Sequence, residues 1–348
     1  NAKWNFSETF TWSSPGFDLN DMGYMKETDY LMNETEIMYR QTDIWKIFRY
    51  NAFTLSQKNM WNYGGTPFSN NASLRWQSMT MNRYEWDVKE TFAWNWLDSR
   101  LLRGGPDVRF GSYFLTSAKF NTDKAKRMMF MLKYEGDHNF EGNRFNTISP
   151  SLTFRLGNHV YLSGQLDYAW NTDEMQYVAT TSPLSSSSLA PYYYVMGHMD
   201  QKTYGLTLKL QVNVTPDISI QFYGAPFTSI AKYDDFKLAA DTKSHTFENR
   251  FQRIDPDQLT YADGVYTIGE GAGQMPFRNP DFRFNEFRSN LVARWEYLPG
   301  STLYFVWEHR MSNRDNWYSS GWGSNLDRMW GLPATNTFMI KMNYWFNL

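Results

Sequence analysis

The 348-residue sequence contains no cysteine. Disulfide bridges, thiolate nucleophiles and cysteine-ligated metal sites are therefore excluded. Charge of one sign is also missing, because 34 lysines and arginines nearly balance 36 aspartates and glutamates, for a formal net charge of −2. This balance removes the electrostatic basis for binding a polyanion, so no nucleic-acid partner is predicted.

Long hydrophobic runs are absent as well. A transmembrane helix needs about 20 consecutive apolar residues, and the apolar stretches of this chain are short and interrupted at every second residue. Aromatic residues nevertheless make up 18% of the chain. A transmembrane β-barrel accounts for both facts, because each of its strands presents alternate residues to lipid and to a polar interior.

The C-terminal segment shows the alternation most clearly. From Phe338 onward, one set of alternate positions is apolar and aromatic, and the other set is largely polar. The two sets are Phe338, Ile340, Met342, Tyr344, Phe346 and Leu348, and Met339, Lys341, Asn343, Trp345 and Asn347. This pattern is typical of the closing strand of an outer-membrane β-barrel, with Tyr344 and Phe346 at its aromatic end. It predicts a location in the bacterial outer membrane, with outer-membrane lipid as the first partner.

Similar segments recur along the whole chain. The alternation predicts strands at 3–12, 33–41, 45–58, 70–82, 84–97, 108–121, 125–137, 143–156, 158–172, 200–214, 217–230, 286–298, 300–312 and 336–347. Between them, short turns alternate with long loops, near 13–32, 59–69, 98–107, 138–142, 173–199, 231–285 and 313–335. The predicted fold class is all-β: a single antiparallel transmembrane β-barrel of about fourteen strands over residues 1–348, with short periplasmic turns and long extracellular loops.

Four stretches carry a family resemblance. They are Leu102–Pro106, Asp200–Leu210 with Ile220–Phe227, Phe287–Trp307 and Tyr344–Asn347. Together they resemble the C-terminal β-barrel domain, of unknown function, of Bacteroidota outer-membrane proteins whose N-terminal part is a family 9 carbohydrate-binding-like module. The resemblance implies an outer-membrane location, with a signal peptide and an N-terminal module upstream of this chain. It implies sugar binding only through that module, and no catalytic residue comes with it.

Charged residues on the inward-facing positions of the predicted strands carry both signs. The strongest candidates for lining the lumen are Lys209, Arg288, Arg294, Glu296, Glu308, Arg310 and Lys341. Buried charges must be paired to be tolerated, so one interpretation is an ion-paired interior that holds the barrel wall. The other is a polar channel lining that selects solutes.

The predicted outer loops offer two further candidates. Loop 231–285 is long and rich in apolar residues, which favours a plug, a lid or a partner-binding surface over an exposed excursion. If it fills the lumen, Phe251, Tyr261 and Tyr266 are expected to be buried. Aromatic side chains of the outer loops could stack on sugar rings or contact a protein, or simply pack within the loops. These residues are Tyr192, Tyr193, Tyr194, Trp317, Tyr318, Trp322 and Trp330.

The sequence assigns no catalytic residue, no metal ligand and no cofactor. It contains neither a Gly-x-Ser-x-Gly elbow nor a His-Glu-x-x-His motif. The predicted function is therefore a non-enzymatic outer-membrane anchor, a subunit of a surface complex that binds a partner or a glycan through its outer loops. Two alternatives stay open: a diffusion channel or transporter for small polar solutes such as oligosaccharides, and a surface glycan-processing enzyme whose chemistry lies outside this chain.

Overall fold

The computed structural model describes residues 3–18, 23, 25, 28–94, 96–184, 191–316 and 321–346. Within these ranges the chain forms one large antiparallel sheet and two small ones. The large sheet has 15 strands; one of them, β14, pairs only with β13 beside the main path, so the path itself contains fourteen. Along that path the strands follow one another in chain order, which is the arrangement of an up-and-down meander.

The path begins with β1 (Trp4–Ser13), β2 (Tyr30–Gln41), β3 (Phe48–Trp61), β4 (Pro67–Thr80), β5 (Glu85–Trp94), β8 (Tyr113–Asn121) and β9 (Met128–Asn139). It continues with β10 (Arg144–Leu156), β11 (Val160–Thr181), β12 (Tyr193–Asn213), β13 (Ile218–Ala239), β18 (Phe282–Leu298), β19 (Ser301–Asp315) and β20 (Ala334–Asn343). Each of the fourteen predicted strand segments overlaps one of these strands. The prediction of an all-β, antiparallel fold is confirmed.

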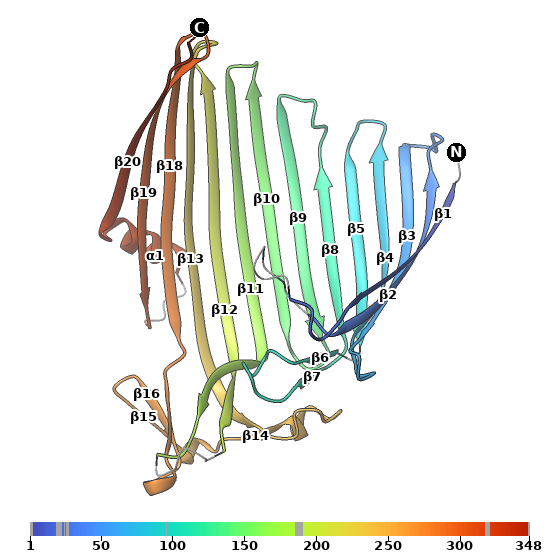
Figure 1. The fold of residues 1–348 in the computed structure, drawn as a ribbon, viewed down its shortest axis with the longest axis vertical. Helices are drawn as coiled ribbons and strands as arrows, with labels where there is room; N and C mark the ends of the chain where they lie inside the picture. The colour runs from blue at the N-terminus through green and yellow to red at the C-terminus, as the bar shows by residue number, and fades with distance from the viewer. Residues whose placement is uncertain are drawn as a thin grey trace.

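The large sheet is curved and open (Figure 1). The first strand pairs only with β2 and the last only with β19, so the sheet is not closed into a barrel. All ten residues of β20 are exposed, because one edge of this strand has no neighbouring strand. Unpaired edges of this length present a row of free backbone donors and acceptors, which folded proteins normally cover or pair.

The two ends of the sheet differ in their connections. Short turns join the strands at the end where β1 begins and β20 finishes (Figure 1). In two of these turns Gly157 and Gly300 have φ angles of 62° and 79°, in the left-handed region that glycine adopts without strain. Most connections at the opposite end, here called the long-loop end, are longer, and several carry structure of their own.

The two faces of the large sheet differ in polarity. One row of directly paired residues crosses six neighbouring strands on a single face: Leu162, Leu210, Phe222, Leu291, Trp307 and Phe338. The next row lies on the opposite face, because successive side chains of a strand alternate. It consists of Ser163, Lys209, Tyr223, Asn290, Glu308 and Thr337. These two sides are called the apolar face and the polar face below.

The loop predicted over 231–285 has different bounds in the structure. Residues 231–239 belong to β13 and residues 282–285 to β18, so the connection covers 240–281. This connection contains β14 (Phe251–Arg253), three short 3-10 helices at Glu248–Arg250, Pro256–Gln258 and Gly271–Gly273, and a small sheet. The small sheet is formed by β15 (Leu259–Ala262), β16 (Val265–Ile268) and β17 (Met275–Arg278).

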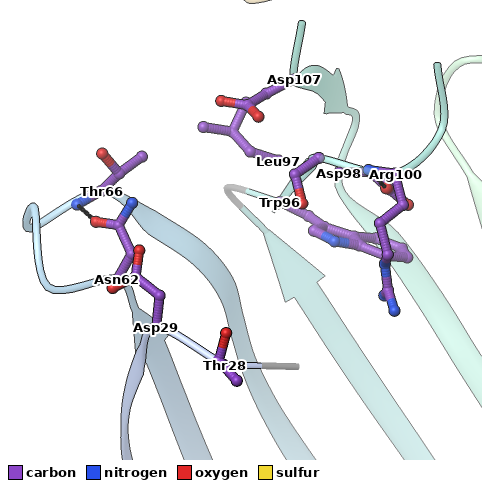
Figure 2. Close-up of a pocket in the computed structure, with 10 residues that line it drawn as sticks. Thr28, Asp29, Asn62, Thr66, Trp96, Leu97, Asp98, Arg100 and Asp107 are labelled. Carbon is purple, nitrogen blue, oxygen red and sulfur yellow. Dashed lines mark hydrogen bonds between the residues drawn. The ribbon is translucent and has the colours of Figure 1, made fainter. Parts of the chain in front are cut away.

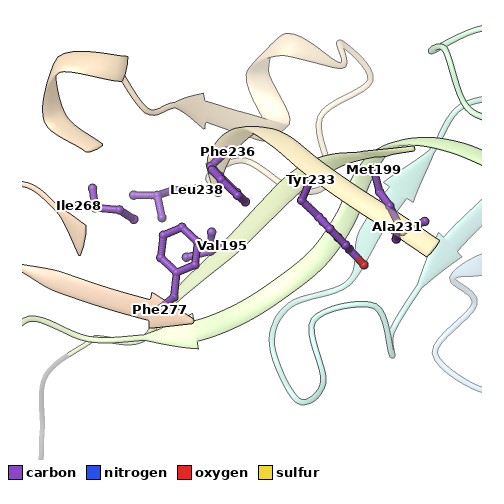
Figure 3. Packing of buried hydrophobic residues seen from close by; sticks show 8 residues of the cluster. All are labelled: Val195, Met199, Ala231, Tyr233, Phe236, Leu238, Ile268 and Phe277. Carbon is purple, nitrogen blue, oxygen red and sulfur yellow. The ribbon is translucent and has the colours of Figure 1, made fainter. Parts of the chain in front are cut away.

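The small sheet packs on the extended ends of β12 and β13. Figure 3 shows Phe236, Leu238 and Val195 of these strands gathered with Ile268 and Phe277 of the small sheet. The ring of Phe236 lies 5.0 Å from that of Phe277 and 4.9 Å from that of Tyr266. Of the three residues predicted to be buried by this loop, Phe251 is buried, Tyr266 is half-buried and Tyr261 is exposed.

A helix replaces part of the loop predicted over 313–335. Helix α1 (Trp322–Trp330) turns Asn325 and Met329 inward, and both are fully buried. The helix contacts β13, β18 and β19, and Asn325 Oδ1 accepts a hydrogen bond from Arg283 of β18. Arg283 pairs with Ile230 in the register and shares the apolar face with Phe287 and Met311. The helix therefore covers a patch of the apolar face at the long-loop end, where that face carries buried polar residues.

Candidate functional site

The long-loop end holds the most highly organised contacts between segments distant in sequence. Residues 96–111, here called the strap, contain β6 (Trp96–Asp98) and β7 (Val108–Phe110), which pair with each other. The strap starts and ends between β5 and β8, yet it contacts the connection that follows β13. Four strands, β9 to β12, separate these two positions in the sheet. The strap therefore crosses the ends of those strands, as Figure 1 shows.

Arg250 is the centre of this crossing. Its side chain is 1% exposed and forms a bidentate ion pair with Glu141, at 2.9 Å from Nη1 to Oε2 and 2.8 Å from Nη2 to Oε1. The same guanidinium donates to three backbone carbonyls, of Arg109, Ser244 and His245. Five hydrogen bonds match the five N–H groups that a guanidinium offers. One side chain thus joins the strap, the β9–β10 turn and the connection after β13.

Further contacts join the strap to the connection after β13. The backbone N–H of Arg109 donates to the carbonyl of Thr242 at 2.9 Å, and the Thr242 hydroxyl donates to the carbonyl of Asp107 at 2.7 Å. Lys243 forms an ion pair with Asp107 at 2.8 Å. Beneath them lies a buried apolar cluster of Leu102, Val108, Met175, Met196 and Phe251. Because burial of apolar side chains drives packing, this cluster fixes the strap independently of the ion pairs.

A pocket of about 360 Å³ opens beside the strap. In Figure 2, Asp29, Asn62 and Thr66 lie on one side of it and Trp96, Asp98 and Arg100 on the other. Several of these polar groups already fix local loop structure. The Asp98 carboxylate accepts hydrogen bonds from the backbone of Arg100 and Leu101, and the Asn62 amide oxygen accepts one from the backbone of Thr66. The pocket is polar enough for a small hydrophilic molecule.

All seven residues predicted to line a lumen lie on the polar face. Lys209 and Glu308 belong to the row described above, and the remaining five occupy positions in the same alternation on β18, β19 and β20. Arg288 and Arg310 both contact Glu286, at 2.9 Å and 3.0 Å, and Arg294 contacts Glu296 at 2.6 Å. The charges thus share one face and several are paired with the opposite sign. Their assignment to a lumen stays a prediction.

A second group of ionisable residues lies where β11 and β12 extend beyond the end of β10. His198 Nδ1 lies 3.1 Å from Glu174 Oε1, and His198 Nε2 lies 3.6 Å from Asp200 Oδ2. Burial alone would lower the pKa of His198, but the hydrogen bond to Glu174 and the charges of Glu174, Asp200 and Asp234 outweigh burial and raise it. Burial raises the pKa of Asp173 beside them. The strand extension therefore holds a proton-sensitive cluster.

The predicted loop aromatics divide into three groups. Tyr193 and Tyr194 open β12 instead of lying in a loop, and they pack against the two buried clusters. Tyr192 is exposed. Trp330, at the end of α1, is also exposed, and its ring lies 4.9 Å from that of Phe287 in β18. Trp317, Tyr318 and the side chain of Trp322 lie outside the described residues. Tyr344 and Phe346 of the predicted closing strand follow the end of β20 and are exposed.

The strap, the Arg250 contacts and helix α1 were not predicted from the sequence. For α1 a signal exists, because Trp322, Asn325, Leu326 and Met329 follow helical spacing between two glycines. For the contacts of Arg250 no local signal exists, since its main partners Arg109 and Glu141 lie more than 100 positions away.

Within the described part of the chain, no group of three or more His, Asp or Glu residues is arranged to hold a metal ion. No helix in the same ranges is long and apolar enough to cross a membrane.

The fold and its long-loop end define an all-β protein built on one large antiparallel meander. The model of one family, a domain of unknown function designated DUF5916, matches residues 1–348. The chain belongs to this family. No curated protein and no solved structure matches it.

Proposed function

We propose that this protein is an outer-membrane β-barrel in which β1 pairs with β20 and the apolar face contacts lipid. Within that membrane setting, it acts as a non-enzymatic anchor whose long-loop end binds a partner protein or a glycan. The observation that carries the proposal is the apolar face, which extends over the strands from β1 to β20. Phe6, Leu55, Leu166, Phe305 and Ile340 are among its exposed residues.

The extent of this face favours contact with lipid over contact with water. Soluble monomeric proteins rarely expose a contiguous apolar patch of more than about 300–600 Å². Here large side chains such as Leu55 at 55% and Ile340 at 72% exposure stand on one side of strands along the whole path. A bilayer covers such a surface on every strand at once, and the polar alternate residues then face the interior.

The strand count supports closure of the sheet. The path holds fourteen strands, so β1 and β20 run in opposite directions and their free edges are compatible with an antiparallel pair. Closing the sheet would satisfy the backbone groups of β20, which otherwise meet hydrocarbon without hydrogen-bond partners. The even number and the short turns at one end agree with the general architecture of bacterial outer-membrane barrels.

The anchor role rests on the long-loop end. Its connections are packed around two buried apolar clusters, as a recognition module of a soluble protein would be. Exposed aromatic side chains, Tyr192, Tyr261 and Trp330, project from it. Aromatic side chains contribute large contact areas to protein interfaces and pockets. These three residues are the proposed contacts to a partner or glycan.

A second candidate function is a channel for small polar solutes. It is favoured by the polar face, where Lys209, Asn290 and Tyr223 border an open hollow of about 460 Å³. Closing the sheet would place this hollow in the interior. A lining of both signs, such as the Arg294–Glu296 pair, suits neutral solutes better than ions of one sign.

Cysteine pairs test closure directly, because the native chain has no cysteine. Ser7 of β1 is replaced by cysteine and combined, one at a time, with cysteine at Thr337, Met339, Lys341 or Asn343 of β20. After folding into lipid vesicles and mild oxidation, one register is expected to form an intramolecular disulfide in high yield. The matched control pairs cysteine at Ser7 with cysteine at Ser219 in β13, which is remote from β1 along the sheet. Failure of every β1–β20 pair to cross-link in vesicle-inserted protein would contradict the closed barrel.

A further inference from the structure

We infer that Arg250, Glu141 and the strap form a fixed brace that closes the long-loop end of the barrel interior. This inference rests on the proposed barrel and narrows its function, because a braced interior makes an anchor and not an open channel. The brace consists of the strap, the β9–β10 turn and residues 240–250. It is built from segments that the linear sequence keeps far apart.

The position of the strap relative to the polar face supports the inference. A pocket of about 160 Å³ lies between the two; its lining includes Trp96 and Phe110 of the strap and Tyr113, Asp137 and Asn171 of the sheet. By register, Tyr113, Asp137 and Asn171 belong to the polar face. The strap therefore lies over the polar side of the sheet. In a closed barrel that side is the interior.

The span of the brace is the second argument. The strap leaves the sheet between β5 and β8 and is bonded to residues that follow β13, across the ends of four strands. Stacking of Trp96 on Phe110, with ring centroids 4.8 Å apart, keeps its two arms together. A segment that crosses these strand ends on the polar side lies across the interior that closure of the sheet would create.

The chemistry of Arg250 makes the cover permanent. All five of its N–H groups have acceptors, and its side chain is nine-tenths or more buried. Opening the brace would leave the Arg250 guanidinium, the Glu141 carboxylate and the Arg109 carbonyl without these partners at once. Breaking one partner of a buried ion pair is strongly destabilising because an uncompensated charge remains. Thermal opening of the brace is therefore rare, so it does not provide a path for solutes.

Gly111 provides a way to disturb the brace without removing a charge. Its backbone N–H donates to Glu141 Oε2 at 3.0 Å, and a Cβ built at this position would lie 2.5 Å from the carboxyl carbon of Glu141. In the Gly111→Ala variant the Glu141 carboxylate must shift, and we expect this shift to weaken its ion pair with Arg250. Gly273 is the matched control, because it lies in the same long connection as Arg250 and a Cβ there meets nothing within 4 Å.

The test is single-channel conductance in planar bilayers at neutral pH. Intact protein and the Gly273→Ala variant are expected to insert and remain silent, whereas Gly111→Ala shows steady conductance steps. Cleavage by trypsin at Arg100 or Arg103 of the strap should accelerate at least tenfold in Gly111→Ala alone. A second variant, Arg250→Met, removes the same contacts from the other side and should conduct as well.

The outcomes separate the two proposals. Insertion is measured first, by flotation with lipid vesicles and by resistance of the strands to protease. Protein that does not insert contradicts the barrel itself. Protein that inserts and conducts steadily when intact overturns the brace and leaves the barrel standing. Silence of both Gly111→Ala and Arg250→Met after verified insertion also overturns the brace, because the interior would then be closed by something else.

Discussion

The strands near the short turns and the structure at the long-loop end obey opposite rules of burial. In the strands, large apolar side chains such as Leu55 and Ile340 are more than half exposed. At the long-loop end, Val195 and Met196 are 0% exposed and belong to two closed clusters. The polar residues reverse in the same way. The ion-paired strand residues Arg288, Arg294 and Glu296 lie on the open polar face, whereas Arg250 is buried with every donor paired.

This contrast supports the proposal that the two regions contact two different solvents, water and lipid. The long-loop end is packed as water requires, with apolar groups inside and buried charges paired. The strands are patterned for a medium that accepts apolar side chains on the outside, as lipid does. In the proposed barrel, one chain contains both a water-adapted region, the long-loop end, and a lipid-adapted region, the strands. The border between them lies where β11, β12 and β13 continue beyond their neighbours.

The largest expected effect concerns the water-adapted region. Replacing Arg250 by Met leaves Glu141 buried without its partner and should destabilise the long-loop end by about 3–5 kcal/mol. The effect is measured as the change in protease-accessible opening of the strap in folded protein. The control is Arg253→Met, because Arg253 is 77% exposed and lies 3.8 Å from Asp235. Its surface ion pair should be worth about 0–1 kcal/mol. Equal effects of both substitutions would contradict the account of the long-loop end as a packed region held by a buried ion pair.

The second prediction concerns the lipid-adapted region. Leu208 lies on the apolar face with Gly164 and Gly224 as its paired neighbours. If this face meets lipid, Leu208→Arg should cost about 2–4 kcal/mol of folding free energy in vesicles, as charges do at the bilayer midplane. Thr207→Arg on the polar face is the control and should change it by less than about 1 kcal/mol. Titration with denaturant in the presence of vesicles gives both values. A harmless Leu208→Arg would mean that water covers the apolar face.

The smallest expected effect concerns the border between the two regions, where β11 and β12 extend beyond the end of β10. Because the pKa of His198 is raised above its usual 6.5, the charged imidazole is favoured in the folded state. Its stabilising contribution is fully present below pH 6.5 and is lost as pH rises through the raised pKa. Amide hydrogen exchange should therefore show lower protection of the β11–β12 extension at pH 8 than at pH 6. The His198→Gln variant should lose this pH dependence, while protection of the remaining strands stays the same.

Prediction from the sequence succeeded where one rule governs the residues. Alternation located every strand of the main path, because each strand separates an apolar from a polar face. It ended β11 and β13 too early and began β12 and β18 too late. In their extensions residues of both alternations are buried, as with Val195 and Met196, so the alternation disappears. The strap and its brace could not be predicted, because the contacts of Arg250 with Glu141 and Arg109 follow from the three-dimensional path of the chain.

The measurement that tests the central claim most directly is the environment of successive residues along one strand. Since the chain has no cysteine, single cysteines can be placed at positions 162 to 167 of β11 and labelled with a nitroxide. In vesicles, accessibility to oxygen dissolved in lipid should be high at Leu162, Gly164 and Leu166. It should be low at Ser163, Gln165 and Asp167, where a water-soluble relaxant reaches the label instead. Equal access of the water-soluble relaxant to all six positions would contradict a lipid-facing apolar face.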